Sequence, residues 1–426
     1  MMPLVKKYLN KSFVIWSLIF LFGVFLTLNK NSKRESGIGS YQSEFWADKG
    51  GYYIYLPYAF IADFDAGKLP DNIEESTGNS FEIRKDRLTS KYMIGVAILQ
   101  TPFFLIAHGV AKLSYNKPTG FEKVYANWMG IGSVFYLILG LYFTFVLIRK
   151  LFGRRLGIIS LILILFGTNL FYYAVDETLM SHVYGFAMIA LLNYVIIGKV
   201  EFNGKWGVIG LLSALVVLLR PINAIYLMVL FFAYRKHLDR PNLDKSNIGF
   251  AIIAVLLFSL QMLYWYNAYG TLYPSGYQSE SFSNLFSPNL ILVLFSPNNG
   301  YLPYALVFGI VLLLSIVRWK VTEHKRLVLL SWVTFGTMIY VTAAWWTYDF
   351  GCGMGVRNMV DFSSLWMIMV ALVLKTMEQN NRVFRGVIAF LLILCLFNMK
   401  LTYAYDNCFF GDSNWDWQFY FEKIWS

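Results

Sequence analysis

Long apolar runs recur through this 426-residue chain and restrict it to a helical fold embedded in a membrane. Hydrophobic residues make up 57% of the chain and charged residues only 14%, which is typical of membrane proteins rather than of water-soluble globules. Because about 20 residues cross a bilayer as a helix, the length allows roughly ten to twelve spans. The predicted spans are residues 13–28, 125–148, 156–174, 180–198, 206–219, 222–234, 248–265, 301–317, 327–344, 359–374 and 387–399.

One further apolar run, residues 92–113, decides the side of the membrane on which every later loop lies. If this run does not cross, the short segments on the N-terminal side carry 20 Lys and Arg residues and those on the opposite side carry 4. If it crosses, the asymmetry inverts. Because short cytoplasmic loops are enriched in Lys and Arg, we predict about eleven spans, a cytoplasmic N-terminus and an outward C-terminus. Residues 92–113 then form interfacial helices on the outer face. The first span, 13–28, has no small-residue cleavage motif and is expected to be retained.

The loop between the first two spans, residues 29–123, is long enough to form a structured unit on the outer face. It contains the stretch FWADKGGYYIYLPY, in which Asp48 precedes a Gly-Gly pair and a run of aromatics. Glycines let a backbone approach a ligand closely, and rings such as those of Tyr52 and Tyr53 suit the apolar faces of a sugar or a prenyl chain. The stretch therefore predicts a substrate site around Asp48. In the alternative interpretation, the aromatics are interfacial anchors and Asp48 is a solvated loop charge.

The predicted topology brings other unusual polar residues to the same outer face. Asp176, Glu177 and His182 lie in FYYAVDETLMSHVYGF, between the third and fourth spans. Charged groups at span ends are costly near lipid and usually face a cavity or a partner. The remaining members of this set are Lys91 in the first outer loop, Arg220 at the end of the fifth span, and Trp345, Trp346 and Arg357 before the tenth span.

Each of these residues also has a purely structural interpretation. Asp176 and Glu177 suit the start of the following helix as a cap and a first-turn acid, and His182 suits a hydrogen-bonded packing position. Arg220 could extend to the lipid headgroups, and the two tryptophans could belong to an interfacial belt. A metal site on Asp176, Glu177 and His182 is not predicted, because their spacing matches no standard ligand motif.

Together, the outer-face residues suit sugar transfer from a lipid phosphate. Arginines hold phosphate through charge-assisted, often bidentate hydrogen bonds, the role predicted for Arg220 and Arg357 together with Lys91. A carboxylate on a glycine-flanked turn can remove a proton from an acceptor hydroxyl, the role predicted for Asp48. Asp176, Glu177 and His182 are predicted to orient the acceptor or the sugar donor.

The order of these segments resembles that of the membrane-embedded GT-C glycosyltransferases, in the bacterial branch related to protein O-mannosyltransferases and aminoarabinose transferases (glycosyltransferase family 39-like). The family's first outer loop, with its catalytic acid, corresponds to ADKGGYYIYLP, and the start of its interfacial helix to KYMIGVAILQTPFF. Its second acidic loop corresponds to VDETLMSHVYGF. The family's Arg-Pro segment corresponds to LLRPIN and its Ser-Pro-x-x-Gly segment to SPNNGYLPY. Its Trp-Trp…Arg segment corresponds to WWTYDFGCGMGVRNM.

The resemblance implies an all-α GT-C domain over residues 1–400, with 29–123 as a large periplasmic loop, followed by a short periplasmic tail, 401–426. It also implies a bacterial inner membrane as the location. The implied reaction is inverting transfer of a sugar from a polyprenyl-phosphate donor to a hydroxyl or amine-type group of an acceptor protein or glycolipid. Asp48 would be the catalytic base, and Asp176 or Glu177 a second catalytic carboxylate. Metal dependence varies among the relatives, so no cofactor is predicted to be required.

Two other functions remain open. A glycan polymerase or ligase would also use outward arginines, on a prenyl-pyrophosphate substrate, but would carry its essential residues in a large late outer loop. A flippase or transporter of lipid-linked sugars would show mid-span charges and an internal repeat, whereas these spans are nearly free of such charges. The net charge of +11 comes from basic residues at span ends and predicts no nucleic-acid binding. The three cysteines form no metal or redox motif, although Cys352 and Cys408 could pair on an oxidising face.

Overall fold

A computed structural model describes residues 2–35, 37–238, 245–272, 280–405 and 413–425 of the chain. Helices form nearly all of the regular structure in these ranges. The one sheet that they contain is an antiparallel hairpin of β1 (Glu82–Arg84) and β2 (Arg87–Thr89), in which Ile83 pairs with Leu88. The predicted all-α class is therefore confirmed.

Every predicted span overlaps helix. The helices are α1 (Met2–Lys33), α6 (Lys123–Phe152), α7 (Arg154–Gly167), α8 (Leu170–Val175), α9 (His182–Ile196), α10 (Lys205–Leu219), α11 (Ala224–Tyr234), α12 (Lys245–Tyr269), α14 (Tyr301–Tyr304), α15 (Leu306–Val317), α16 (Lys325–Ala344), η4 (Arg357–Phe362), α17 (Ser363–Lys375) and α18 (Asn381–Ala404). Residues 156–174 are divided between α7 and α8, and residues 301–317 between α14 and α15. Among the described residues, seven helical segments, α5 included, are long and apolar enough to cross a membrane, and four shorter apolar helices accompany them. The chain is thus a multi-pass membrane protein, and the count of eleven spans stays a prediction.

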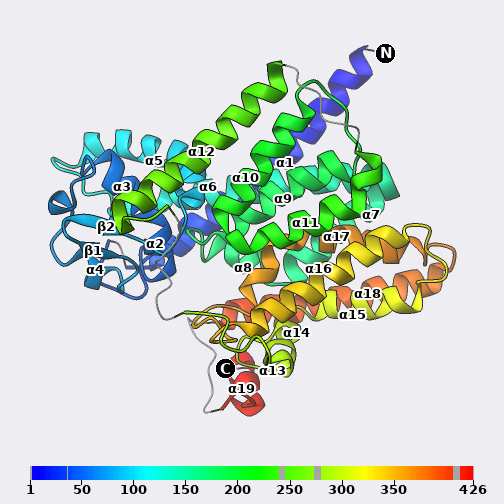
Figure 1. Cartoon of the computed structure of the whole chain (residues 1–426). Coiled ribbons are helices and arrows are strands. Elements are labelled where there is room, and N and C mark those ends of the chain that lie inside the picture. Colours follow the sequence, from blue (N-terminus) through cyan, green and yellow to red (C-terminus); the bar gives the residue numbers. More distant parts are fainter. Residues whose placement is uncertain (1, 36, 239–244, 273–279, 406–412, 426) are drawn as a thin grey trace.

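The loop between the first two predicted spans, which we predict to lie on the outer face, folds as a unit at one end of the bundle, on the left of Figure 1. Its elements are α2 (Asp48–Tyr53), α3 (Tyr55–Phe60), η1 (Ala66–Lys68), α4 (Ile73–Ser76), the β1–β2 hairpin and α5 (Gly95–Ser114). The unit has its own core, in which Phe45 lies 4.7 Å from Tyr53 and 5.3 Å from Phe121 between ring centroids. We call it the outer unit.

Helix α5 packs against α6 and α10. Its start abuts the end of α10, since a Cβ added at Gly95 would lie 2.4 Å from the carbonyl of Leu218. Further along α5, His108 Nδ1 lies 2.7 Å from the hydroxyl of Tyr125, near the start of α6. Helix α5 therefore runs back beside the first part of α6, and whether it crosses the membrane stays a prediction.

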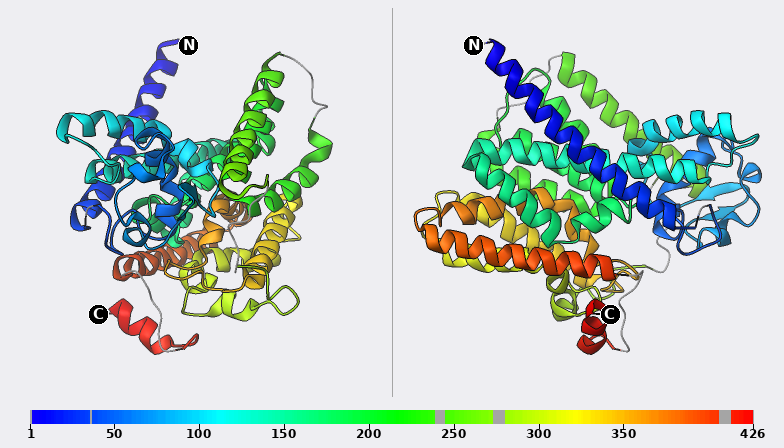
Figure 2. Two further views of the ribbon diagram at one scale, coloured as in Figure 1. Left: turned by 60° about the vertical axis from the view of Figure 1, so that its left-hand side comes forward. Right: turned by 180° about the vertical axis from the view of Figure 1, so that it is seen from behind.

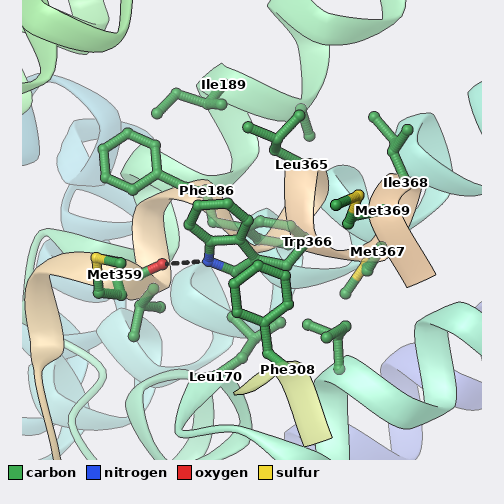
Figure 3. Close-up of a cluster of buried hydrophobic side chains, with 14 of the residues drawn as sticks. Leu170, Phe186, Ile189, Phe308, Met359, Leu365, Trp366, Met367, Ile368 and Met369 are labelled. Carbon is green, nitrogen blue, oxygen red and sulfur yellow. Dashed lines mark hydrogen bonds between the residues drawn. The ribbon is translucent and has the colours of Figure 1, made fainter. Parts of the chain in front are cut away.

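The middle of the bundle is built around α17, which is buried along residues 363–374. Figure 3 shows Trp366 of α17 against Phe308 of α15, with ring centroids 4.4 Å apart, and Phe186 of α9 nearby. The Trp366 indole donates a 3.0 Å hydrogen bond to the carbonyl of Met359. In a bilayer, close packing rather than the hydrophobic effect holds helices together. This packing also fixes η4, the segment directly before α17.

The remaining elements are η2 (Pro221–Asn223), η3 (Arg235–His237), α13 (Leu290–Phe295) and the C-terminal α19 (Trp417–Trp425). The hydroxyl of Tyr420 donates a 2.9 Å hydrogen bond to the carbonyl of Pro303, so α19 is attached beside α14. Seen from behind, α1 crosses the bundle obliquely and ends at the outer unit (Figure 2). Of the cysteines, Cys395 is a free buried thiol and Cys352 is disulfide-bonded, while Cys408 lies outside the described residues.

The topology can be tested with two introduced cysteines at exposed positions, Asn116→Cys after α5 and Phe202→Cys between α9 and α10. If α5 does not cross, a membrane-impermeant maleimide should label position 116 in intact cells. Position 202 should be labelled only after the membrane is permeabilised. The parent protein, labelled in parallel, supplies the background. Labelling of 202 in intact cells with protection of 116 would show that α5 crosses.

Candidate active site

Asp48 is the first residue of α2 and meets a partner from a distant part of the chain. Its Oδ2 lies 2.7 Å from Nη2 of Arg357, at the start of η4, and its Oδ1 accepts a hydrogen bond from the Tyr92 hydroxyl. The Gly-Gly pair makes this possible, since a Cβ added at Gly51 would lie 2.3 Å from the Tyr92 ring. Two predicted residues, Asp48 and Arg357, are thus held together, and the outer unit is joined to η4.

The surroundings of Asp48 keep its carboxylate ionised. Burial by itself raises the pKa of Asp48, but the Arg357 guanidinium, the Tyr92 hydroxyl and the Lys91 ammonium together outweigh it, and the pKa is lowered. Burial, followed by the charge of Asp48, raises the pKa of Tyr92 well above its usual range, so this hydroxyl remains a proton donor. At neutral pH the ionised carboxylate of Asp48 is therefore held by the guanidinium of Arg357 and the hydroxyl of Tyr92.

A second charged cluster lies around Asp361, whose side chain has no exposure to solvent. Nδ1 of His182 lies 3.0 Å from Oδ1 of Asp361, and the amide of Asn223 donates a 2.7 Å hydrogen bond to Oδ2. Nη1 of Arg220 lies 3.1 Å from His182 Nδ1 and 3.8 Å from Asp361. The carboxylate approaches α9 closely because residue 185 is glycine, where a Cβ would lie 2.7 Å from Asp361 Oδ2.

Aromatic residues connect the two clusters. The ring of Tyr52 lies 4.3 Å from that of Tyr92, and its hydroxyl accepts a 3.2 Å hydrogen bond from Ser181, which precedes His182. The ring of Tyr173 packs edge-on against His182 at 4.9 Å. One region, at the junction of the outer unit, α8, α9 and η4, therefore contains Asp48, Arg357, His182 and Arg220.

Asp176 and Glu177 lie in a separate ion-pair network. Lys30, near the end of α1, lies 3.1 Å from Asp176, while Arg34 and Lys49 lie 3.3 and 3.1 Å from Glu177. Burial raises the pKa of Asp176, whereas Lys49 and Arg34 overcome the effect of burial on Glu177 and lower its pKa. The interpretation of these acids as helix caps is wrong, because α9 begins further along the chain and has no side-chain cap.

The other predicted binding residues divide between the site and its surroundings. Lys91 forms an ion pair of 2.5 Å with Glu280 while acting electrostatically on Asp48. Arg220 does not extend to the headgroups as the alternative interpretation expected, because its side chain is 15% exposed and donates to Asn358.

The predicted aromatic residues other than Tyr52 lie elsewhere. Tyr53 is fully buried in the core of the outer unit, where it packs on Phe45 and Phe121. The ring of Trp345 packs against Phe282, and Trp346 is 50% exposed.

Sequence reasoning missed Asp361, Asn223, Asn358 and Tyr173. A signal for Asp361 was present, because a carboxylate inside an apolar run demands a buried partner. The others carry no charge, and only the fold reveals their positions. Among the described residues, no group of three or more His, Cys, Asp or Glu side chains is placed to hold a metal ion.

Two solved membrane-protein structures share this fold. One is ArnT from Cupriavidus metallidurans bound to undecaprenyl phosphate, 11% identical, with a TM-score of 0.52 over 93% of this chain and 71% of that one. The other is the apo oligosaccharyltransferase of Archaeoglobus fulgidus, 13% identical, with a TM-score of 0.50 over 94% of this chain and 55% of that one. No protein-family model and no curated protein matches the sequence. The GT-C fold that the sequence predicted is confirmed.

Asp361→Asn should destabilise the protein strongly. The change keeps the shape of the side chain but removes the charge that His182 and Arg220 face. We therefore expect a loss of about 1.5–3 kcal/mol in the free energy of unfolding, measured by chemical unfolding in detergent. The control is Asp63→Asn, since the Asp63–Lys68 pair is exposed and should contribute less than about 1 kcal/mol. Equal losses in both variants would show that Asp361 does not hold the cluster together.

Proposed function

We propose that this protein of GT-C fold transfers a sugar from a polyprenyl-phosphate donor to a hydroxyl or amine-type group of an acceptor. We place the reaction on the outer face of a bacterial inner membrane, with the N-terminus in the cytoplasm. The observation that carries the proposal is the Asp48–Arg357 pair, which sets a candidate base against a candidate phosphate ligand at 2.7 Å. The fold supports it, since a neighbour with this fold was solved with undecaprenyl phosphate bound.

The donor phosphate would be held by Arg357 and Lys91. Both cations already face carboxylates, Asp48 and Glu280, so phosphate oxygens would enter where carboxylate oxygens now lie. Arginine binds either group in the same planar, two-pronged geometry. Arg220 would extend the positive region on the side of His182. These cations supply the charge that a leaving phosphate needs, and we propose no metal or other cofactor.

In the proposed reaction, Asp48 accepts the proton of the acceptor hydroxyl as that oxygen attacks the anomeric carbon. The bond from the acceptor oxygen to the anomeric carbon forms while the bond from that carbon to the phosphate oxygen breaks. The electron pair of the broken bond stays on the prenyl phosphate, next to Arg357. Attack from the face opposite the leaving group inverts the anomeric centre.

Asp176 and Glu177 support this site in our proposal by fixing α2. Glu177 pairs with Lys49, which follows Asp48 directly, and Arg34 pairs with both Glu177 and Glu44. This network attaches the end of α1 and the start of α2 to the loop before α9. Asp176 and Glu177 would therefore set the position of the base, while acceptor orientation falls to the residues nearer His182.

Asp48→Asn should bind donor but fail to transfer it. The amide keeps the shape of the side chain but cannot take up a proton, so we expect kcat to fall about 10²–10⁴-fold. Turnover and binding of a panel of prenyl-phosphate sugars would be measured on purified protein in detergent. Asp71→Asn, an exposed acid of the same outer unit, is the matched control. Transfer at the wild-type rate by Asp48→Asn would exclude Asp48 as the base, and turnover only with prenyl-pyrophosphate substrates would indicate a polymerase or ligase.

The pH dependence of kcat/KM provides an independent test. A carboxylate whose pKa is lowered stays ionised as the pH falls, until the pH passes below its ordinary value. The pKa of Asp48 is lowered from 3.8, so Asp48 should be ionised at any pH above about 5. We therefore expect no acidic limb from Asp48 between about pH 5 and pH 8. A limb near pH 6 in the wild type that is missing from the residual activity of Asp48→Asn would contradict this expectation.

A further inference from the structure

Tyr173 is a buried residue next to the site, and its hydroxyl proton has no acceptor among the described residues. The side chain is 1% exposed, so water does not reach it freely. The backbone N–H of Met354 lies where it can donate to the hydroxyl oxygen, but no acceptor for the hydroxyl proton is found in the described part of the chain. A buried hydroxyl without an acceptor is unfavourable. The position is one that a ligand oxygen would complete.

The surroundings of Tyr173 show where this hydroxyl points. A Cβ added at Gly353 would lie 2.8 Å from the Tyr173 oxygen and 3.9 Å from Cδ of Arg357, so both side chains approach the same point. On its other side, the ring packs edge-on against His182, which Arg220 contacts. The hydroxyl therefore lies beside Arg357, whose charge acts on it most strongly, followed by the charges of Glu177 and Asp48.

We propose that Tyr173 is a further substrate-binding residue, whose hydroxyl donates a hydrogen bond to an oxygen of the phosphate group bound by Arg357. The inference rests on the function proposed above and assigns one more contact within it. An uncharged donor beside the Arg357 guanidinium suits an anion better than a sugar hydroxyl, because the cation already selects for negative charge. As the bond from the anomeric carbon to the phosphate oxygen breaks, charge grows on the phosphate and the hydrogen bond strengthens. Tyr173 keeps its proton throughout.

The test removes only the hydroxyl. Tyr173→Phe retains the ring that packs on His182, and the control Tyr172→Phe removes the hydroxyl of the neighbouring residue, whose ring packs against Tyr405. Binding to each purified protein would be measured for two lipids, undecaprenyl phosphate and undecaprenol, together with thermal stability and kcat. We expect Tyr173→Phe to lower affinity for the phosphate lipid, or kcat, about 10- to 100-fold. Its affinity for undecaprenol and its stability should match those of Tyr172→Phe and the wild type.

Each result separates this inference from the function on which it rests. Undiminished affinity for undecaprenyl phosphate together with a normal kcat in Tyr173→Phe would overturn the role of Tyr173. Normal affinity for the phosphate lipid with weaker binding of the sugar donor would overturn the assignment to phosphate and place the hydroxyl on the sugar. A wild-type protein that binds both lipids equally would overturn the prenyl-phosphate function itself, and the role of Tyr173 with it.

Discussion

The carboxylate of Asp361 imposes the strongest constraint on this fold, because it has no exposure to solvent. A buried charge is tolerated only where partners compensate it. Those partners are His182 at the start of α9 and Arg220 and Asn223 at the turn after α10. The ends of α9 and α10 must therefore meet η4 at one point. The requirement for a glycine at position 185 follows from the same contact.

The short helix η4 transmits this constraint to the candidate active site. It carries Arg357 at one end and Asp361 near the other, so a single segment faces both the outer unit and the bundle. The Trp366 indole holds η4 through the carbonyl of Met359, and α17 is buried on all sides. Arg357 is thus presented from a rigid base, whereas Asp48 comes from a folded loop. Because Arg357 is fixed and Asp48 lies on a loop, Arg357 can exchange Asp48 for another anion without any change in the packing of α17.

The helices and several residues of the candidate site could be predicted from the sequence, and the reason can be identified. Hydropathy marks spans directly, and polar residues at the outer ends of spans are forced to one face, so Asp48, His182, Arg220 and Arg357 were found. The partners of Asp176 and Glu177 could not be predicted, because Lys30 and Arg34 are distant in sequence and ordinary in type. The break between α7 and α8 within one predicted span lies at Thr168 and Asn169, which form hydrogen bonds with the distant residues Asn398 and Met354. Tyr173 gave no signal, since a hydroxyl proton that lacks an acceptor among the described residues is recognised only once its neighbours are placed.

Charge balance links these contacts to the proposed chemistry. In the structure every cation of the site faces a carboxylate, with Arg357 on Asp48, Lys91 on Glu280 and Arg220 near Asp361. A phosphodiester that enters adds one negative charge, which Arg357 can accept only as its contact with Asp48 weakens. During transfer the acceptor proton neutralises Asp48 while the leaving phosphate gains a charge. The total charge of the site is therefore unchanged by the reaction, and Arg357 passes from the carboxylate that loses its charge to the phosphate that gains one. A low-dielectric site favours such a step because no charge is created or exposed.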